Sequence, residues 1–268
     1  MKDILLKRIA NTLVVNIQNV DNRGLFNGKT GIAVFLYYYA RYSGISVYSD
    51  VADDLIEDIS NSLNSTGPVD FETGLTGIGW GFQHLLDNQF VEGDADDILS
   101  DVDEHIFKNI SKEKLMPVSS EIHWFGHGLY FLSREKERAL SKEKAEVFKL
   151  MLNSIDGILE HDDSRLSISF LNSVLYFLVE SSTDTAYVKQ KQDIIEKTGK
   201  RISAIESKYM EKTPATLEDY ADLCRQNILY RDAQSHFKKE KIDLTGSMIN
   251  EAFENYEMLS TIGLNILL

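Results

Sequence analysis

The amino-acid sequence predicts an all-α protein, and three observations lead to this prediction. The 268 residues include only three prolines, so few positions interrupt a helix. Many stretches repeat their apolar residues at helical intervals and are rich in Leu, Ile, Glu and Lys, which favour helices. Strand signals are scarce: the one Asn-Gly dipeptide, Asn27-Gly28, is followed by a helical pattern.

A glycine motif recurs along the chain. Residues 28–33 and 74–79 share the pattern Gly-x-Thr-Gly-Ile followed by a small residue, and they lie 46 residues apart. A weaker third copy at residues 126–132 keeps two glycines, and a fourth at 172–178 keeps only the Leu-Tyr-Phe-Leu string of the third. The spacing predicts further copies near residues 218 and 263. We therefore expect about six repeat units along the chain.

Each unit is expected to contain two helices. The first is amphipathic, and the earliest one carries apolar residues at Ile4, Leu5, Ile9, Leu13 and Ile17. Later helices of this type are predicted at residues 51–63, 95–110 and 141–159, with N-caps at Asp50, Asp94 and Ser141. The second helix begins at the glycine motif. It is apolar on most faces, so it should be buried among its neighbours.

The hairpins are expected to close into a ring. A single helical hairpin cannot bury both of its faces, so neighbouring hairpins must stack. An open stack needs polar terminal units, but the last unit ends in the apolar residues 261–268. We expect this end to pack on the first hairpin. The predicted fold is an α/α toroid of about six helical hairpins, a single domain over residues 1–268, with apolar inner helices and charged outer helices.

Charge and cysteine content exclude several functions. The net charge of −14 disfavours binding to nucleic acid or to an anionic membrane. The sequence has no apolar run of 18 residues and no pattern of a signal peptide at its charged N-terminus, so we expect a cytoplasmic protein. Cys224 is the only cysteine, which excludes an internal disulfide and a zinc site built from several thiolates. The oligomeric state is left open.

The motif glycines have two interpretations. They are Gly28, Gly31, Gly74, Gly77, Gly126 and Gly128. In the first interpretation they are structural, because a missing Cβ lets backbone segments approach closely where inner helices crowd together. In the second, glycine-rich turns and helix N-termini form a basin for an anion such as a peptide carboxylate or a phosphate. The steric interpretation is favoured, and the pattern of a nucleotide-binding loop is absent.

Residues 71–80 resemble the Gly-Leu-x-Gly-Ile-Gly signature of lanthionine synthetase C-like proteins, and residues 24–33 are similar to the same element in an earlier hairpin. The resemblance implies an α/α toroid from bacterial lanthipeptide biosynthesis. In family enzymes, zinc held by two Cys and one His activates a Cys thiol that adds to a dehydrated residue of a peptide. This chain departs from that pattern, because Cys224 is followed by Arg225 and no second Cys exists. It is also shorter than family enzymes, which usually have seven hairpins. His127-Gly128 is similar to the family element with an acid–base His, which makes His127 the candidate catalytic residue.

We therefore expect a toroid that binds a peptide or protein during peptide modification. We expect it to contain neither zinc nor another cofactor. The candidate binding residues are aromatic, imidazole or acidic side chains near the glycine motifs: Tyr38, Glu72, Trp80, His84, His123, Trp124 and His127. His123 and His127 would share one helix face, as metal ligands do, and Glu121 could add a carboxylate, but no third ligand is certain. We expect His127 at a central crevice and His123 on the loop before it.

An enzyme that uses the same basin is the alternative. It would be a divergent peptide cyclase or a glycosidase, which needs two positioned carboxylates. Asp70, Glu72 and Glu121 precede inner helices and are the candidates. The acidic run Asp94, Asp96 and Asp97 lacks the rest of a calcium-binding loop, so we expect it to start a helix, where the dipole favours acids.

Overall fold

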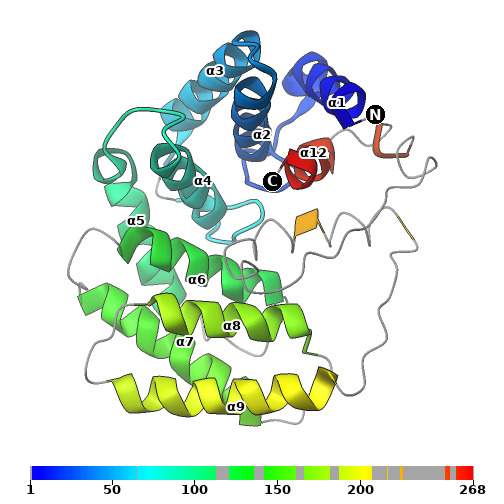
Figure 1. Ribbon diagram of the computed structural model, residues 1–268. Coiled ribbons are helices and arrows are strands. Elements are labelled where there is room, and N and C mark those ends of the chain that lie inside the picture. Colours follow the sequence, from blue (N-terminus) through cyan, green and yellow to red (C-terminus); the bar gives the residue numbers. More distant parts are fainter. Residues whose placement is uncertain are drawn as a thin grey trace. The chain divides into compact units, whose positions relative to one another are not determined.

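In the part of the chain that it describes, the computed structural model consists of helices joined by loops, which confirms the predicted all-α class (Figure 1). It describes residues 2–64, 66–112, 121–135, 142–160, 166–181, 187–206, 216, 224–225, 251–253 and 258–267. No strand occurs among these residues. In the same ranges, no helix has the length and apolar character needed to cross a membrane.

Helices of two kinds alternate along the chain. Two helices begin at the glycine motif and three contain one of its weaker copies. These motif helices are α2 (Lys29–Ser43), α4 (Leu75–Asp87), α6 (Glu121–Glu135), α8 (Ile168–Glu180) and α12 (Leu259–Leu267). The flanking helices between them are α1 (Lys2–Asn16), α3 (Val47–Ser62), α5 (Ala95–Lys112), α7 (Lys142–Glu160) and α9 (Val188–Glu206). A short 3-10 helix, η1 (Ile17–Asn19), follows α1. Helices α2 and α4 start at the two clear motifs, 46 residues apart, as predicted. The predicted start of α6 is late, because α6 begins at Glu121, before Gly126. The copy near residue 218 lies largely outside the described residues.

Burial separates the two kinds of helix as expected. In α2, every residue from 30 to 37 is buried, whereas α3 buries only Tyr48, Ala52, Leu55 and Ile59. The predicted stripe of α1 is wrong at its start, because Ile4 is 76% exposed. At 100° per residue, Ile4 and Leu13 lie on opposite sides of a helix, and α1 buries the side that contains Leu13.

Of the three predicted N-caps, one is confirmed, one is wrong and one lies outside the described residues. Asp94 precedes α5, and its carboxylate accepts a hydrogen bond from the Asp96 N–H at 2.8 Å, so the predicted N-cap is confirmed. Asp50 is not an N-cap: α3 begins one turn earlier, after Ser46, and Asp50 lies within its first turn. Ser141 lies outside the described residues.

The helices belong to two compact units. Unit 1 contains residues 1–102, 213–229 and 239–268, and unit 2 contains residues 103–212 and 230–238. Within unit 1, α12 packs against α1 and α2 (Figure 1). A Cβ at Gly263 of α12 would lie 2.5 Å from the ring of Phe35. The apolar C-terminal helix therefore covers the first hairpin, as expected from the sequence. The closed ring and the single domain stay predictions.

Candidate functional site

The two glycine motifs form the same backbone structure. In each copy, the first N–H of the motif helix and the threonine hydroxyl next to it donate to carbonyls of the preceding loop. Lys29 N–H donates to Asn22 O (2.9 Å), and Thr30 Oγ1 donates to Arg23 O (2.6 Å). The equivalent bonds of the second copy measure 2.8 and 2.5 Å and join Leu75 to Pro68 and Thr76 to Val69. The N–H and hydroxyl donors at these two helix starts are therefore hydrogen-bonded to carbonyls of their own loops.

The glycines allow close backbone approach. A Cβ at Gly31 would lie 2.0 Å from Leu25 O, and a Cβ at Gly77 would lie 1.9 Å from Phe71 O. Gly28 and Gly74 are similarly close to carbonyls of the loops before them. These distances are far shorter than any real carbon–oxygen contact, so the local fold requires glycine here. The geometry supports the steric interpretation of the motif over the anion basin.

The two motif loops also contact each other. Phe26 N–H donates to Glu72 O at 2.8 Å, and these two residues are themselves 46 apart. A Cβ at Gly24 would lie 2.3 Å from the Cα of Thr73. Equivalent backbone segments of neighbouring repeats are therefore in direct contact.

One of the three carboxylates proposed for a glycosidase, Asp70, has a structural role. Asp70 accepts hydrogen bonds from the backbone N–H groups of Thr73 (2.7 Å) and Gly74 (3.2 Å), so it caps the motif loop. Glu72 is half-buried in the same loop. The side chain of Glu121, in the first turn of α6, is outside the described part of the chain.

Three predicted binding residues meet on α2 and α4. Tyr38 Oη and His84 Nε2 share a hydrogen bond of 3.0 Å, and the ring of Trp80 stacks on the ring of His84 at 4.8 Å. The ring of Phe90, which the sequence did not single out, lies 4.7 Å from that of Tyr38. All four side chains are half-buried. We call Tyr38, Trp80, His84 and Phe90 the aromatic cluster.

The other predicted residues belong to α6 in unit 2. Trp124 and His127 are only 4% and 1% exposed. The indole ring of Trp124 packs edge-on against Phe170 and Phe177 of α8, and its N–H has no hydrogen-bond partner among the described residues. His123 lies in the first turn of α6 and not on the loop before it, and its side chain is not described. The catalytic assignment of His127 stays a prediction.

The two glycines of α6 lie inside the helix. Gly126 is buried, and a Cβ at Gly128 would lie 3.1 Å from the ring of Phe177 and 3.2 Å from the terminal methyl of Met151. Gly128 therefore faces side chains of α7 and α8, whereas Gly31 and Gly77 face backbone.

The only thiol is in the apolar core. Cys224 is 1% exposed and belongs to the same buried hydrophobic cluster of unit 1 as Ile32 and Leu259. The part of the chain that the structure describes contains no group of three His, Cys, Asp or Glu side chains able to hold a metal ion. Because Cys224 is the only thiol of the sequence, the two-thiolate donor set of the family enzymes cannot be assembled from this chain.

Sequence reasoning missed a buried polar network in unit 2. Arg134 donates from Nε and Nη2 to Asp103 at 3.0 and 2.8 Å, and the hydroxyl of Tyr130 donates to the same carboxylate. The side chains of Arg134 and Asp103 are 5% and 16% exposed. Burial, followed by the charge of Asp103, raises the pKa of Tyr130 well above its usual value. The sequence feature that could have predicted this network is the spacing of Tyr130 and Arg134, which lie four residues apart on an otherwise apolar helix face.

Two lysines perform the same task in successive repeats. Lys144 of α7 donates to Arg134 O (2.7 Å) at the end of α6, and Lys191 of α9 donates to Ser181 O (2.9 Å) at the end of α8. A cation is favourable there because the last carbonyls of a helix carry partial negative charge. The two lysines are 47 residues apart, so the repeat could have identified them.

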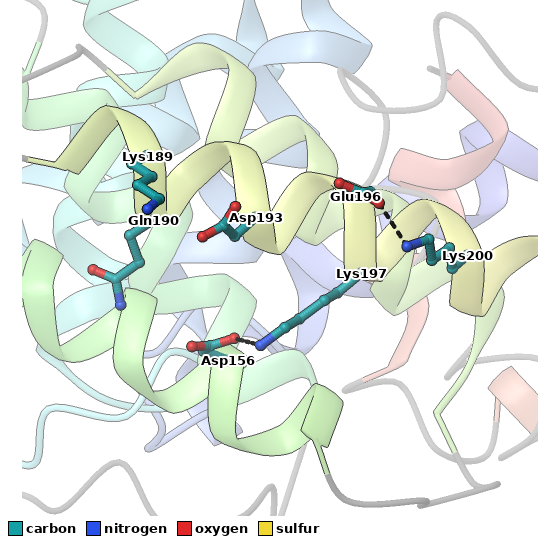
Figure 2. Close-up of a pocket in the computed structure, with 7 residues that line it drawn as sticks. All are labelled: Asp156, Lys189, Gln190, Asp193, Glu196, Lys197 and Lys200. Atoms are coloured by element: carbon teal, nitrogen blue, oxygen red, sulfur yellow. Dashed lines mark hydrogen bonds and ion pairs between the residues drawn. The ribbon is translucent and has the colours of Figure 1, made fainter.

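A groove of about 520 Å³ lies between the flanking helices α7 and α9 (Figure 2). It is lined by Asp156, Lys189, Gln190, Asp193, Glu196, Lys197 and Lys200. Lys197 pairs with Asp156, and Lys200 pairs with Glu196, each at 2.5 Å. Three lysines face three acids, so the groove has no net charge with which to select a ligand, and its exposed pairs contribute little to stability.

Comparison with known proteins gives one match. A sequence model of the family described as lanthionine synthetase C-like protein matches residues 19–209. No curated protein and no solved structure matches the chain. The matched segment includes both clear glycine motifs and covers more than half of the 268 residues. The chain therefore belongs to the lanthionine synthetase C-like family, whose fold is an α/α toroid.

Proposed function

We propose that this chain is a lanthionine synthetase C-like protein without the zinc site of the cyclases, and that it binds a peptide or protein during peptide modification. One observation carries the proposal: the lone cysteine is enclosed in the apolar core. Family enzymes hold zinc with two Cys and one His, and a single buried thiol cannot supply that set. Bacterial origin and cytoplasmic location rest on the sequence and the family resemblance, and they stay predictions.

The aromatic cluster is the proposed binding surface. Trp80 and Tyr38 present partly exposed rings, and His84 and Tyr38 add polar atoms beside them. Trp and Tyr are enriched among the residues that dominate binding energies, because they bury a large apolar area and still make a hydrogen bond. Such a surface suits a peptide side chain.

The enzyme alternatives have less support. A glycosidase needs a pair of positioned acids, and Asp70 already serves as a loop cap. A peptide cyclase needs an activated thiol, and the family activates it with zinc. We therefore favour binding over catalysis.

Peptide selection tests the binding half of the proposal. A random-peptide phage library is selected on the immobilised protein, and enriched peptides are synthesised and measured by fluorescence anisotropy. We expect Trp80→Ala to weaken binding of such peptides about tenfold or more, because an anchor ring is removed. Val179→Ala, at an exposed position of α8, is the control and should bind as the unaltered protein does. Selected peptides that bind Trp80→Ala equally well would refute the aromatic cluster as the site.

A further inference from the structure

The turn that carries Phe90 has a strained backbone. Asn88 ends α4, and Phe90 N–H donates to Leu85 O at 2.9 Å, which closes the turn. Within it, Gln89 adopts a left-handed conformation (φ 56°), where helices that end in this way usually have glycine. The other described non-glycine residue with a positive φ is Asn27, and asparagine tolerates this region better. The turn therefore needs support from other residues.

Arg41 of α2 supplies this support. Its Nη2 donates to the carbonyls of Asn88 and Gln89 at 2.8 and 3.3 Å. The last carbonyls of a helix carry partial negative charge, so a guanidinium is a favourable donor there. The same guanidinium lies 3.5 Å from the centre of the Phe90 ring. Arg41 thus contacts each residue of the turn.

Phe90 connects this turn to the rest of the aromatic cluster. Its ring lies 4.7 Å from that of Tyr38. Tyr38 is also the hydrogen-bond partner of His84, whose ring stacks on that of Trp80. A chain of contacts therefore leads from Arg41 through Phe90 to the middle of the cluster.

We propose that Arg41 is a positioning residue for the aromatic cluster, which holds the strained turn so that Phe90 lies against Tyr38 before a peptide binds. This inference rests on the proposed function and deepens it by naming the residue that preorganises the site. Strained backbone persists only where its surroundings over-determine it, and such positions cluster at binding sites. Preorganisation raises affinity, because the cost of ordering the site is met before binding. Arg41 acts through Phe90 and needs no contact with the ligand.

Two substitutions separate this role from simple stabilisation of the fold. Arg41→Met keeps the apolar stem of the side chain at an exposed helix position and removes its hydrogen-bond donors. Gln89→Gly removes the strain of the turn, because glycine adopts the left-handed conformation readily. If Arg41 acts by holding the strained turn, Gln89→Gly should compensate for Arg41→Met. Circular dichroism and the Tm check that each variant folds.

The first measurement follows the Phe90 ring without a ligand. In protein with 13C-labelled Phe and Tyr, the nuclear Overhauser effect (NOE) between the rings of Phe90 and Tyr38 is recorded, and Phe90→Leu identifies its signal. We expect this NOE to lose most of its intensity in Arg41→Met and to return in Arg41→Met/Gln89→Gly. An NOE of unchanged intensity in Arg41→Met would overturn the inference.

The second measurement is the affinity for peptides selected on the unaltered protein, by fluorescence anisotropy. Arg41→Met should weaken binding about fivefold or more, and Arg41→Met/Gln89→Gly should bind within about twofold of the unaltered protein. The matched control is Arg8→Met on α1, which removes another guanidinium that lies on a phenylalanine ring, 3.7 Å from the centre of Phe253. This control should change binding less than about twofold, since it leaves the turn intact.

The outcomes distinguish this inference from the proposed function. Peptides that lose affinity for Trp80→Ala but bind Arg41→Met as tightly as the unaltered protein would overturn this inference alone. Enrichment of no peptide, or of peptides that bind Trp80→Ala equally well, would refute the proposed function and with it the role of Arg41 in binding. Weakened binding to Arg41→Met that Gln89→Gly does not restore would also overturn the inference, because Arg41 would then act by another route.

Discussion

Unit 1 and unit 2 build similar helical hairpins with different contacts. In unit 1, the motif loops pack backbone against backbone, and glycine is needed where the carbonyls of Leu25 and Phe71 approach. In unit 2, the rings of Phe131 and Phe148 stack at 5.8 Å, and buried polar side chains join the helices. The sequence repeat therefore determines that each unit forms helical hairpins, but it does not determine which contacts stabilise them.

The difference predicts how each unit responds to substitution. A backbone carbonyl cannot move without disturbing its helix or loop, whereas a side chain can change its rotamer. Unit 1 should be sensitive to added atoms at its glycines. Unit 2 should be sensitive to the loss of charged partners.

The largest effect is expected in unit 2 at Asp103. Asp103→Ala removes the carboxylate that pairs with the buried Arg134 cation and accepts the Tyr130 hydroxyl. Breaking a buried pair typically costs about 3–5 kcal/mol, and we expect a loss of that size in the free energy of unfolding, measured in urea. The matched control is Glu196→Gln, which breaks an exposed pair with Lys200 and should leave the free energy of unfolding almost unchanged. Equal losses in the two variants would contradict this.

The glycines give the most direct comparison of the units. Gly77→Ala would place Cβ 1.9 Å from Phe71 O, and the backbone shift should cost about 3 kcal/mol. Gly128→Ala meets only the Phe177 and Met151 side chains at 3.1 and 3.2 Å, so it should cost about 1 kcal/mol or less. The urea midpoints of Gly77→Ala and Gly128→Ala, each compared with that of the unaltered protein, measure the two losses. A larger loss at Gly128 than at Gly77 would reverse the proposed contrast.

A smaller effect is expected at Lys191. Lys191→Met removes the hydrogen bond to Ser181 O and should lower the free energy of unfolding by about 1 kcal/mol at neutral pH. Lys189→Met, at an exposed position of the same helix, is the control.

The pH dependence of stability sharpens the test at Lys191. Burial lowers the pKa of the Lys191 ammonium, so between that lowered pKa and about 10.4 the unfolded chain binds the proton more strongly. In this window the Lys191 contribution to stability rises with pH, since the folded chain no longer has to bury a charge. The difference in stability between unaltered protein and Lys191→Met should therefore grow in the window. A difference that shrinks there would argue against the buried ammonium.

The smallest effect is a gain in stability. Gly157 lies in α7 with no atom within 4 Å of an added Cβ. Gly157→Ala should raise the free energy of unfolding by about 0.5–1 kcal/mol, because alanine favours the helix. A lower thermal midpoint than that of the unaltered protein would mean that the position is less open than described.

Much of the fold could be predicted because the repeat is local in sequence. The two clear glycine motifs locate the starts of α2 and α4, and the apolar C-terminus predicts the packing of α12 on the first hairpin. Tyr38 and His84, which share a hydrogen bond, are also 46 residues apart, since equivalent positions lie side by side in stacked repeats. The same rule could have paired them in advance.

The rest depended on contacts that sequence spacing does not encode. The partner of Arg134 is Asp103 on a different helix, and nothing in the sequence distinguishes that acid from its exposed neighbours on α5. Trp80 directly follows the second glycine motif and Trp124 lies just before the third copy, yet Trp80 is half-buried and Trp124 is almost fully buried. Side-chain exposure is decided by the neighbouring helices, which sequence alone does not place.

The proposal that this chain has no zinc-dependent cyclase site is tested most directly by the metal content of the protein. The chain is purified without chelators or an affinity tag that binds metal, and zinc is measured by mass spectrometry against protein concentration. We predict far less than one zinc per chain, unchanged in Cys224→Ala, because the only thiol lies in the apolar core. One tightly held zinc per chain that is lost in Cys224→Ala would contradict the proposal.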